Sequence, residues 1–407
     1  MPAVTEPFAG RRPTFLPDGL ITYGSFINQD VRYLQQRQAI EQSFGNSDGN
    51  ILSFSPMLTF NGIIEPLFYN QKSFSGENTG KMTMASSVIN AAPVINPWIS
   101  GAVSFVYPTL PLAQNLVEGS TLSDNPNLLV SQAFVNIGNL SQTPFYMTIG
   151  QEYLPFGQEF SNMISIAMPT TLGSTKLMTA SIGKTTIKDN DFFATAYIFD
   201  SKTTLDNRAA GGLNGGYKFS SKHLNVSGDV GASLISSISD AGGFQATGAP
   251  TGEFQGFDSN ASTEAVAQVP GIDFYTLITV GPYNFISEYV SSLYPFDSTA
   301  LSYNGNGAQP SALNTEISRS FALFNQKASL AFGYSFSEEA LALQLPRQSF
   351  TTTLNMSIWP HTLQAIEFQH SLNYKSSDYA SGIGSTENTN GTSTSADFVA
   401  LLVNVSF

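Results

Sequence analysis

The last ten residues of the chain, Phe398-Val399-Ala400-Leu401-Leu402-Val403-Asn404-Val405-Ser406-Phe407, indicate the fold most directly. Counted back from Phe407, every second residue as far as Val399 is apolar. Successive side chains of a β-strand point to opposite faces, so these apolar residues share one face of a strand. The closing strand of a membrane barrel and an ordinary C-terminal strand of a soluble sandwich both fit this pattern.

The same alternation recurs through the chain and favours the membrane barrel. Residues 327–336, 348–358 and 366–374 alternate large apolar side chains with Ser, Thr, Asn and Gly, where a soluble sandwich would place charges. A wall with lipid outside and a polar lumen inside requires this composition. Phe407 then resembles the terminal phenylalanine that the assembly machinery of bacterial outer-membrane barrels recognises, and we expect it to be the assembly signal.

Connection lengths support this interpretation independently. Seven short turns alternate with eight longer polar stretches, at 71–81, 108–127, 153–175, 201–209, 238–268, 295–311, 337–347 and 376–395. Outer-membrane barrels have short periplasmic turns and longer outside loops. The chain is therefore predicted to form an all-β, transmembrane antiparallel barrel of about 16 strands. The predicted strands are 60–70, 82–94, 98–107, 128–139, 144–152, 175–187, 192–200, 210–220, 223–237, 269–280, 283–294, 312–324, 327–336, 348–358, 361–375 and 397–407.

Composition excludes several other classes. The 407 residues carry a formal net charge of -13, so no basic surface is predicted for nucleic acid. Cysteine is absent, which removes disulfide scaffolds and thiol chemistry. The start, Met1-Pro2-Ala3-Val4, lacks the features of a signal peptide. We expect the sequence to be a mature form located in the outer membrane of a Gram-negative bacterium.

The N-terminal segment, residues 1–48, does not alternate and precedes the predicted barrel, residues 49–407. Residues 27–44 predict one short helix, with Ser25 or Asn28 as its cap and Gly45 at its end. The helix can plug the lumen or lie in the periplasm. The segment is much shorter than the plug domain of energised siderophore receptors, so that class of receptor is not expected.

No enzyme, metal site or cofactor is predicted. The three histidines, His223, His361 and His370, have no metal-binding spacing, and no catalytic nucleophile and base pair stands out. Candidate functional residues are instead charges on the lumen face. These are Glu65, Glu152, Asp229, Asp273, Glu288 and Glu367, with Lys218 and Lys327 as opposing charges. They can form a cation-selective wall or be hydrogen-bonded wall residues. Trp98 and Trp359 flank short turns and are expected in an aromatic girdle.

Several stretches together resemble the LbtU-type siderophore porin family of intracellular Gammaproteobacteria such as Legionella and Francisella. They are residues 60–69, Asn96-Pro97-Trp98-Ile99-Ser100, residues 131–140 and residues 144–157, and the likeness is strongest over residues 60–200. The resemblance implies an outer-membrane barrel that imports iron-loaded siderophore or iron without a large plug. The implied partners are ferric siderophore or iron, membrane lipid and lipopolysaccharide, and the barrel assembly machinery. A general small-solute porin and a structural or adhesive barrel stay open as alternatives.

Overall fold

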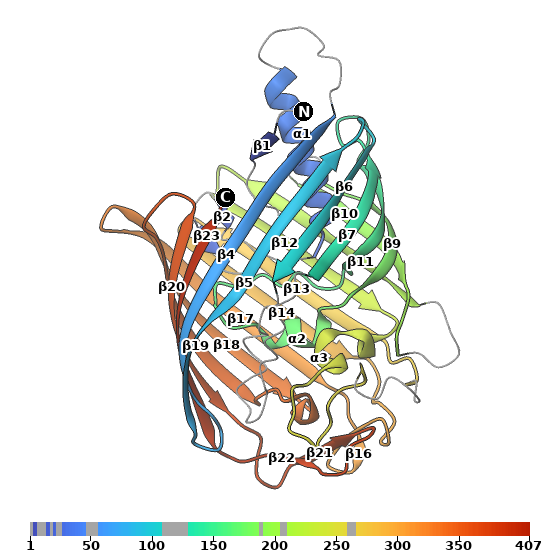
Figure 1. Ribbon diagram of the computed structural model, residues 1–407, viewed down its shortest axis with the longest axis vertical. Helices are drawn as coiled ribbons and strands as arrows, with labels where there is room; N and C mark the ends of the chain where they lie inside the picture. The colour runs from blue at the N-terminus through green and yellow to red at the C-terminus, as the bar shows by residue number, and fades with distance from the viewer. Residues whose placement is uncertain are drawn as a thin grey trace.

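Sixteen strands close into an antiparallel barrel, which confirms the predicted fold class (Figure 1). The computed structural model describes residues 3–5, 14–16, 19–21, 27–45, 56–107, 129–186, 190–203, 210–258 and 266–407. The barrel strands are β4 (Met57–Lys72), β5 (Asn78–Val94), β6 (Ile99–Tyr107), β7 (Leu129–Gly138), β8 (Phe145–Tyr153), β9 (Lys176–Lys184), β10 (Asp191–Phe199), β11 (Ala210–Ser221), β12 (Val226–Ile235), β13 (Gly271–Val280), β14 (Tyr283–Ser292), β17 (Ser311–Leu323), β18 (Gln326–Glu338), β19 (Gln348–Ser357), β20 (Thr362–Leu372) and β23 (Ser395–Ser406). Each pairs with the next strand of this series, and β23 pairs with β4 to close the ring.

The alternation along each strand divides the wall into two faces. On β8, Phe145, Met147 and Ile149 are exposed on the outside, whereas Thr148 and Glu152 are buried inside. The outward side chains are apolar and suit contact with lipid, whereas the inward ones are polar and need hydrogen-bond partners. The polar inner face therefore needs water or other polar groups in the lumen, the space that the wall encloses.

The predicted strands all occur, with a few differences at their ends. The first expected loop, 71–81, is wrong in extent, because β4 continues to Lys72 and β5 already begins at Asn78. The β4–β5 pairing shifts register between Glu65 and Pro66, since proline has no N–H to donate to the ladder. Two charged residues that interrupt the apolar outer face have outside partners. Arg319 lies 5.7 Å from the Tyr283 ring centroid, and His370 pairs with Asp397 at 2.7 Å.

Both chain ends lie at the end of the barrel that carries the short turns, here called the turn end (Figure 1). The turn between β17 and β18 shows how short these connections are. Phe324 and Asn325 alone span it, with φ of 50° and 61°. Two consecutive left-handed residues form the type of hairpin turn whose twist matches that of the strands. The opposite end, here called the loop end, carries the long connections.

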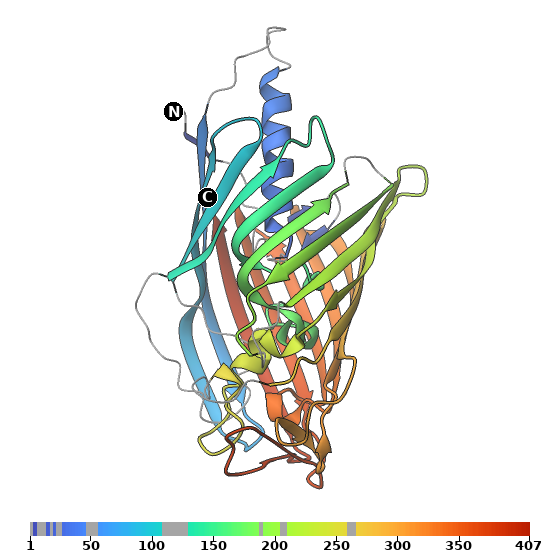
Figure 2. The ribbon, with the colours of Figure 1, turned by 90° about the vertical axis from the view of Figure 1, so that its right-hand side faces the viewer.

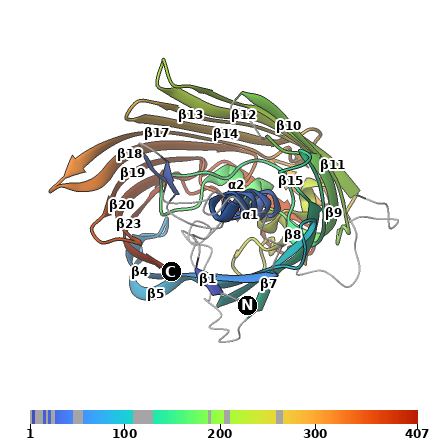
Figure 3. The same cartoon turned by 90° about the horizontal axis from the view of Figure 1, so that it is seen from above.

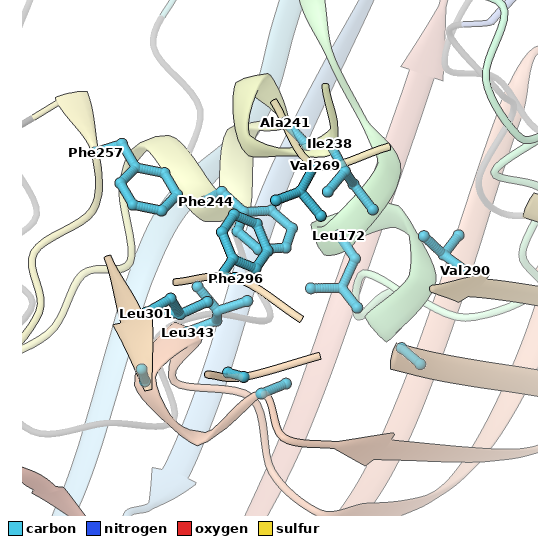
Figure 4. Close-up of a cluster of buried hydrophobic side chains, with 14 of the residues drawn as sticks. Leu172, Ile238, Ala241, Phe244, Phe257, Val269, Val290, Phe296, Leu301 and Leu343 are labelled. Carbon is cyan, nitrogen blue, oxygen red and sulfur yellow. The ribbon is translucent and has the colours of Figure 1, made fainter. Parts of the chain in front are cut away.

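Ordered loops form a lid at the loop end. It contains a small sheet of β15 (Leu301–Tyr303), β16 (Asn306–Gly307), β21 (Tyr379–Gly382) and β22 (Thr389–Asn390). Helix α3 (Gly242–Gln245) and two 3₁₀ turns, Ile238–Asp240 and Leu341–Leu343, complete it. Its core stacks the rings of Phe244, Phe257 and Phe296 beside Leu301 and Leu343 (Figure 4). Burial of this apolar cluster holds the loops together as one body.

The N-terminal segment contributes three short strands and a helix. β1 (Ala3–Thr5) runs parallel to the start of β4, and β2 (Thr14–Leu16) pairs with β3 (Gly19–Ile21). Helix α1 (Gln29–Gly45) lies close to the predicted bounds of 27–44. Seen from above, α1 lies inside the ring of strands (Figure 3).

Candidate functional site

Residues 154–175, between β8 and β9, form a loop that folds into the lumen. This connection, here called the lumen loop, was expected to be an outside loop, and that expectation is wrong. Its helix α2 (Met168–Gly173) lies within the ring of strands (Figure 3) and is buried throughout. Phe156, Met168 and Leu172 join the apolar core of the lid. Lid and lumen loop therefore share one core, and the polar segment 157–165 passes along the inner wall.

Glu288 on β14 fixes the start of this polar segment. The backbone N–H of Gln158 donates to its Oε1 at 2.9 Å, and the N–H of Glu159 donates to its Oε2 at 3.0 Å. Ser233 Oγ accepts the preceding N–H, from Gly157, at 2.8 Å. Hydrogen bonds to a carboxylate are among the stronger ones in proteins. Glu288 thus satisfies loop N–H groups that would otherwise be buried without partners.

Glu316 and Glu367 fix the middle and end of the segment in the same way. Glu316 on β17 accepts hydrogen bonds from Ser161 Oγ at 2.6 Å and from the Asn162 N–H at 2.7 Å. Glu367 on β20 accepts from the N–H groups of Ile164 and Ser165, and from Thr353 Oγ1 at 2.8 Å. Three wall carboxylates on three strands therefore hold nine loop residues, 157–165, against one side of the barrel.

For Glu288 and Glu367, the structure shows the hydrogen-bonded alternative rather than an open row of pore charges. Both carboxylates are buried and face the lumen, as predicted, but their oxygens accept hydrogen bonds from the loop. Glu316 has the same role and is absent from the predicted set. It alternates with the outward Ile317, so the strand pattern that identified the other two also places it inside.

Helix α1 enters the lumen from the turn end (Figure 2). Thr148 Oγ1 donates to the Asp30 carboxylate at 2.7 Å, and Asn136 Nδ2 donates to the Asp30 carbonyl at 3.0 Å. Arg37 donates to the carbonyl oxygens of Gly138 and Pro97. Burial raises the pKa of Asp30, an effect that the Thr148 hydrogen bond partly offsets. The described part of α1 thus lies inside the ring of strands (Figure 3), and its action as a plug stays a prediction.

The helix and the lumen loop meet inside the barrel. The Arg32 guanidinium lies 5.4 Å from the ring centroid of Phe160, within reach of a cation–π interaction. Burial lowers the pKa of Arg32 to about 10, and the charges of Asp229 and Asp30 oppose this shift. Arg32 is therefore still a cation at neutral pH. The lumen is occupied from both ends, by α1 from the turn end and by the loop from the other.

The remaining predicted lumen charges are dispersed along the wall. Asn404 Nδ2 donates to Glu65 at 2.7 Å, and Lys218 lies 3.7 Å from Asp229. Asp273 is buried beside Ser233, whose Oγ donates to it at 3.4 Å. Glu152 is buried on the lumen face of β8, and Lys327 is exposed near the turn end of β18. Asp273 also lies beside Glu288 next to Gly157, whereas the other five residues are spread along the wall.

The predicted girdle and assembly residues lie at the turn end. Trp98 and Trp359 are 42% and 60% exposed beside short turns, and their role as membrane anchors stays a prediction. The Phe407 ring covers Gly62, where a β-carbon would overlap it, and the two residues exchange backbone hydrogen bonds of 2.9 and 3.1 Å. Phe407 thus joins the end of β23 to β4 by backbone hydrogen bonds and ring packing. Its role as assembly signal stays a prediction.

Within the described ranges, no three Asp, Glu or His side chains are placed to share a metal ion. The same residues contain no helix with the length and apolar character needed to cross a bilayer.

Comparison with known proteins gives the family. No protein-family model matches the chain. A UPF0422 protein of Legionella pneumophila strain Philadelphia 1 is 35% identical over 413 residues, covering 100% of this chain and 77% of the relative. The chain belongs to the UPF0422 family. Another UPF0422 protein, from Coxiella burnetii, is 28% identical and covers 93% of this chain and 78% of the relative. The name states no solute, so the siderophore-porin resemblance stays a prediction for this UPF0422 barrel.

Solved structures similar to this UPF0422 chain are outer-membrane porins and channels. An anion-selective porin from Comamonas acidovorans has a TM-score of 0.54 at 10% identity, covering 87% of this chain and 100% of the porin. The outer membrane channel DcaP of Acinetobacter baumannii has a TM-score of 0.50 at 11% identity, covering 87% of this chain and 98% of the channel. At these identities the likeness shows the fold alone, which is a porin-like barrel.

Proposed function

We propose that this protein is a gated outer-membrane channel that conducts a small solute. The observation that carries the proposal is a closed barrel whose polar lumen is filled by two separate elements, α1 and the lumen loop. A purely structural barrel needs neither element to be attached by polar groups. Polar attachment suits an element that moves in a channel, because water can replace part of its hydrogen bonding when it is displaced.

For the solute we propose iron-loaded siderophore or iron, which is what the sequence resemblance implies. The relatives from Legionella support this choice of solute, because the siderophore-porin resemblance is to proteins of bacteria such as Legionella. A general diffusion porin is the alternative. The location we propose is the outer membrane of a Gram-negative bacterium, which the porin-like fold supports.

Single-channel conductance of the refolded barrel tests the proposal. We expect brief openings in planar bilayers, and block of the open current by ferric siderophore at saturating concentration. Iron-free siderophore at the same concentration is the matched control. Openings without any ligand effect would favour the general porin, and a barrel that never conducts, with or without α1, would contradict the channel.

A further inference from the structure

Glu159 is an unusual residue near the start of segment 157–165. Its side chain is 2% exposed, and its backbone has φ of 58°, which is rare for a residue with a side chain of this size. Among the described residues, neither carboxyl oxygen has a hydrogen-bond partner of normal geometry. A buried carboxylate without partners carries a large desolvation cost, whereas the neutral acid carries a much smaller one.

The neighbouring carboxylate of Glu288 further disfavours the ionised form of Glu159. Its own N–H is held by Glu288 on β14, and the carboxyl of Asp273 on β13 lies within reach of the charge that Glu159 carries when ionised. A cation, Arg32 of α1, lies over the ring of the next residue, Phe160, and also faces Asp229 and Asp30. Burial, and then the charge of Glu288, raise the pKa of Glu159 to about 8, while the nearby Ser174 side chain lowers it slightly.

We propose that the segment 157–165 is a pH-sensitive latch, which holds the lumen loop to the wall while Glu159 is protonated and loosens as Glu159 ionises. The inference rests on the proposed function, because the segment lies in the proposed conduction path. Glu159 is a positioning residue, because it contacts no solute. When its side chain ionises, the docked position becomes less stable, and the hydrogen bond from its own N–H to Glu288 is weakened.

The direction of the effect follows from proton linkage. Released into water, Glu159 regains an ordinary pKa of 4.5. The docked loop therefore binds more protons than the released loop between these two values, so docking weakens as pH rises through this window and levels off above about 8. With these two pKa values, the equilibrium constant for docking of the loop falls roughly a hundredfold between pH 6 and pH 9.

Spin labelling of the full-length barrel tests the latch without relying on transport. The sequence contains no cysteine, so Ile166→Cys gives a single nitroxide site next to the segment. We expect its mobile spectral component to increase from pH 6 to pH 9, and to stay constant in Glu159→Gln. Glu159→Met serves if the glutamine variant fails to fold, and Glu338→Gln, which removes an exposed carboxylate, should keep the pH response.

Two results would overturn the latch: no pH response in the parent protein, or an unchanged response when Glu159 cannot ionise. Conductance recorded over the same pH range separates the two proposals. Increased nitroxide mobility with no rise in open probability would support the latch and contradict the gating role of the loop in the proposed channel.

Discussion

The substitution Glu316→Gln tests how strongly the barrel wall holds the lumen loop. Glu316 accepts four hydrogen bonds, two at each carboxylate oxygen. Ser161 Oγ and Asn314 Nδ2 donate to Oε1, and the N–H and Nδ2 of Asn162 donate to Oε2. Glutamine has nearly the same shape but only one side-chain oxygen. Whichever way the amide is turned, two donors lose their acceptor. At the Oε1 position these are Ser161 of the loop and Asn314 of the wall itself, and at the Oε2 position both belong to Asn162 of the loop, so at least one loop contact is lost.

The size of the effect follows from these contacts. A hydrogen bond to a charged group contributes about 1.5–3 kcal/mol, so losing at least one loop contact weakens docking by at least about 1.5 kcal/mol. Since 1.4 kcal/mol corresponds to a factor of ten, the released form of the loop should become at least roughly tenfold more populated. The barrel itself should persist, because β17 keeps its backbone pairing with β14 and β18.

Hydrogen exchange of the peptide that spans residues 154–167 measures this population directly. We expect its protected amides to exchange at least roughly tenfold faster in Glu316→Gln, with the barrel strands unchanged. Glu338→Gln removes the same charge at an exposed position of the neighbouring strand and should leave the loop protected. Equal loop protection in both variants would refute the claim that Glu316 holds the loop.

Three further outcomes are expected. Deleting residues 1–45 should raise single-channel conductance, because α1 lies in the lumen; an unchanged conductance would mean that the helix does not restrict the pore. Phe407→Ala should lower the heat-modifiable fraction on gels, because the half-exposed ring that covers Gly62 is lost at about 1 kcal/mol of packing, and normal yield would contradict this. Epitope tags at Gly256 or Gly384 should be labelled in intact cells and a tag at Asn325 should not, since long loops lie at one end and short turns at the other; the reverse labelling would invert the proposed orientation.

The strands could be predicted because their information is local. Alternation with a period of two specifies both the strand and the face of each residue, as it did for the inward Glu288 and Glu367. It applies equally to Glu316, which was missed although its neighbours Ile317 and Ser318 show the same alternation.

The filling of the lumen could not be predicted, because no local pattern encodes it. The lumen loop looks like any long polar connection, and it folds inward only because residues about 130 to 200 positions later present carboxylates to its backbone. Helix α1 was predicted within two residues at its start and one at its end, but its position depends on distant partners such as Thr148 and Gly138. Such contacts join residues that are far apart in the sequence and become neighbours only in the closed barrel, so no local pattern predicts them.

The lid covers the loop end of the lumen, and the segment 157–165 and helix α1 lie inside it, but different contacts hold each of them in place. These contacts determine which element can be displaced first. The lid and the apolar part of the lumen loop share a core of stacked rings, so displacing them exposes a large apolar area to water. The polar segment 157–165 is held by carboxylates, whose hydrogen bonds water can replace in part. Described side chains of α1 make polar contacts through Asp30, Gln35, Arg37 and Gln38, and two small apolar clusters, one around Val31 and Leu34 and one around Tyr33, pack the helix against the wall. The lid, which has the largest apolar core, is therefore the hardest of the three elements to displace, so opening should begin with α1 or with segment 157–165.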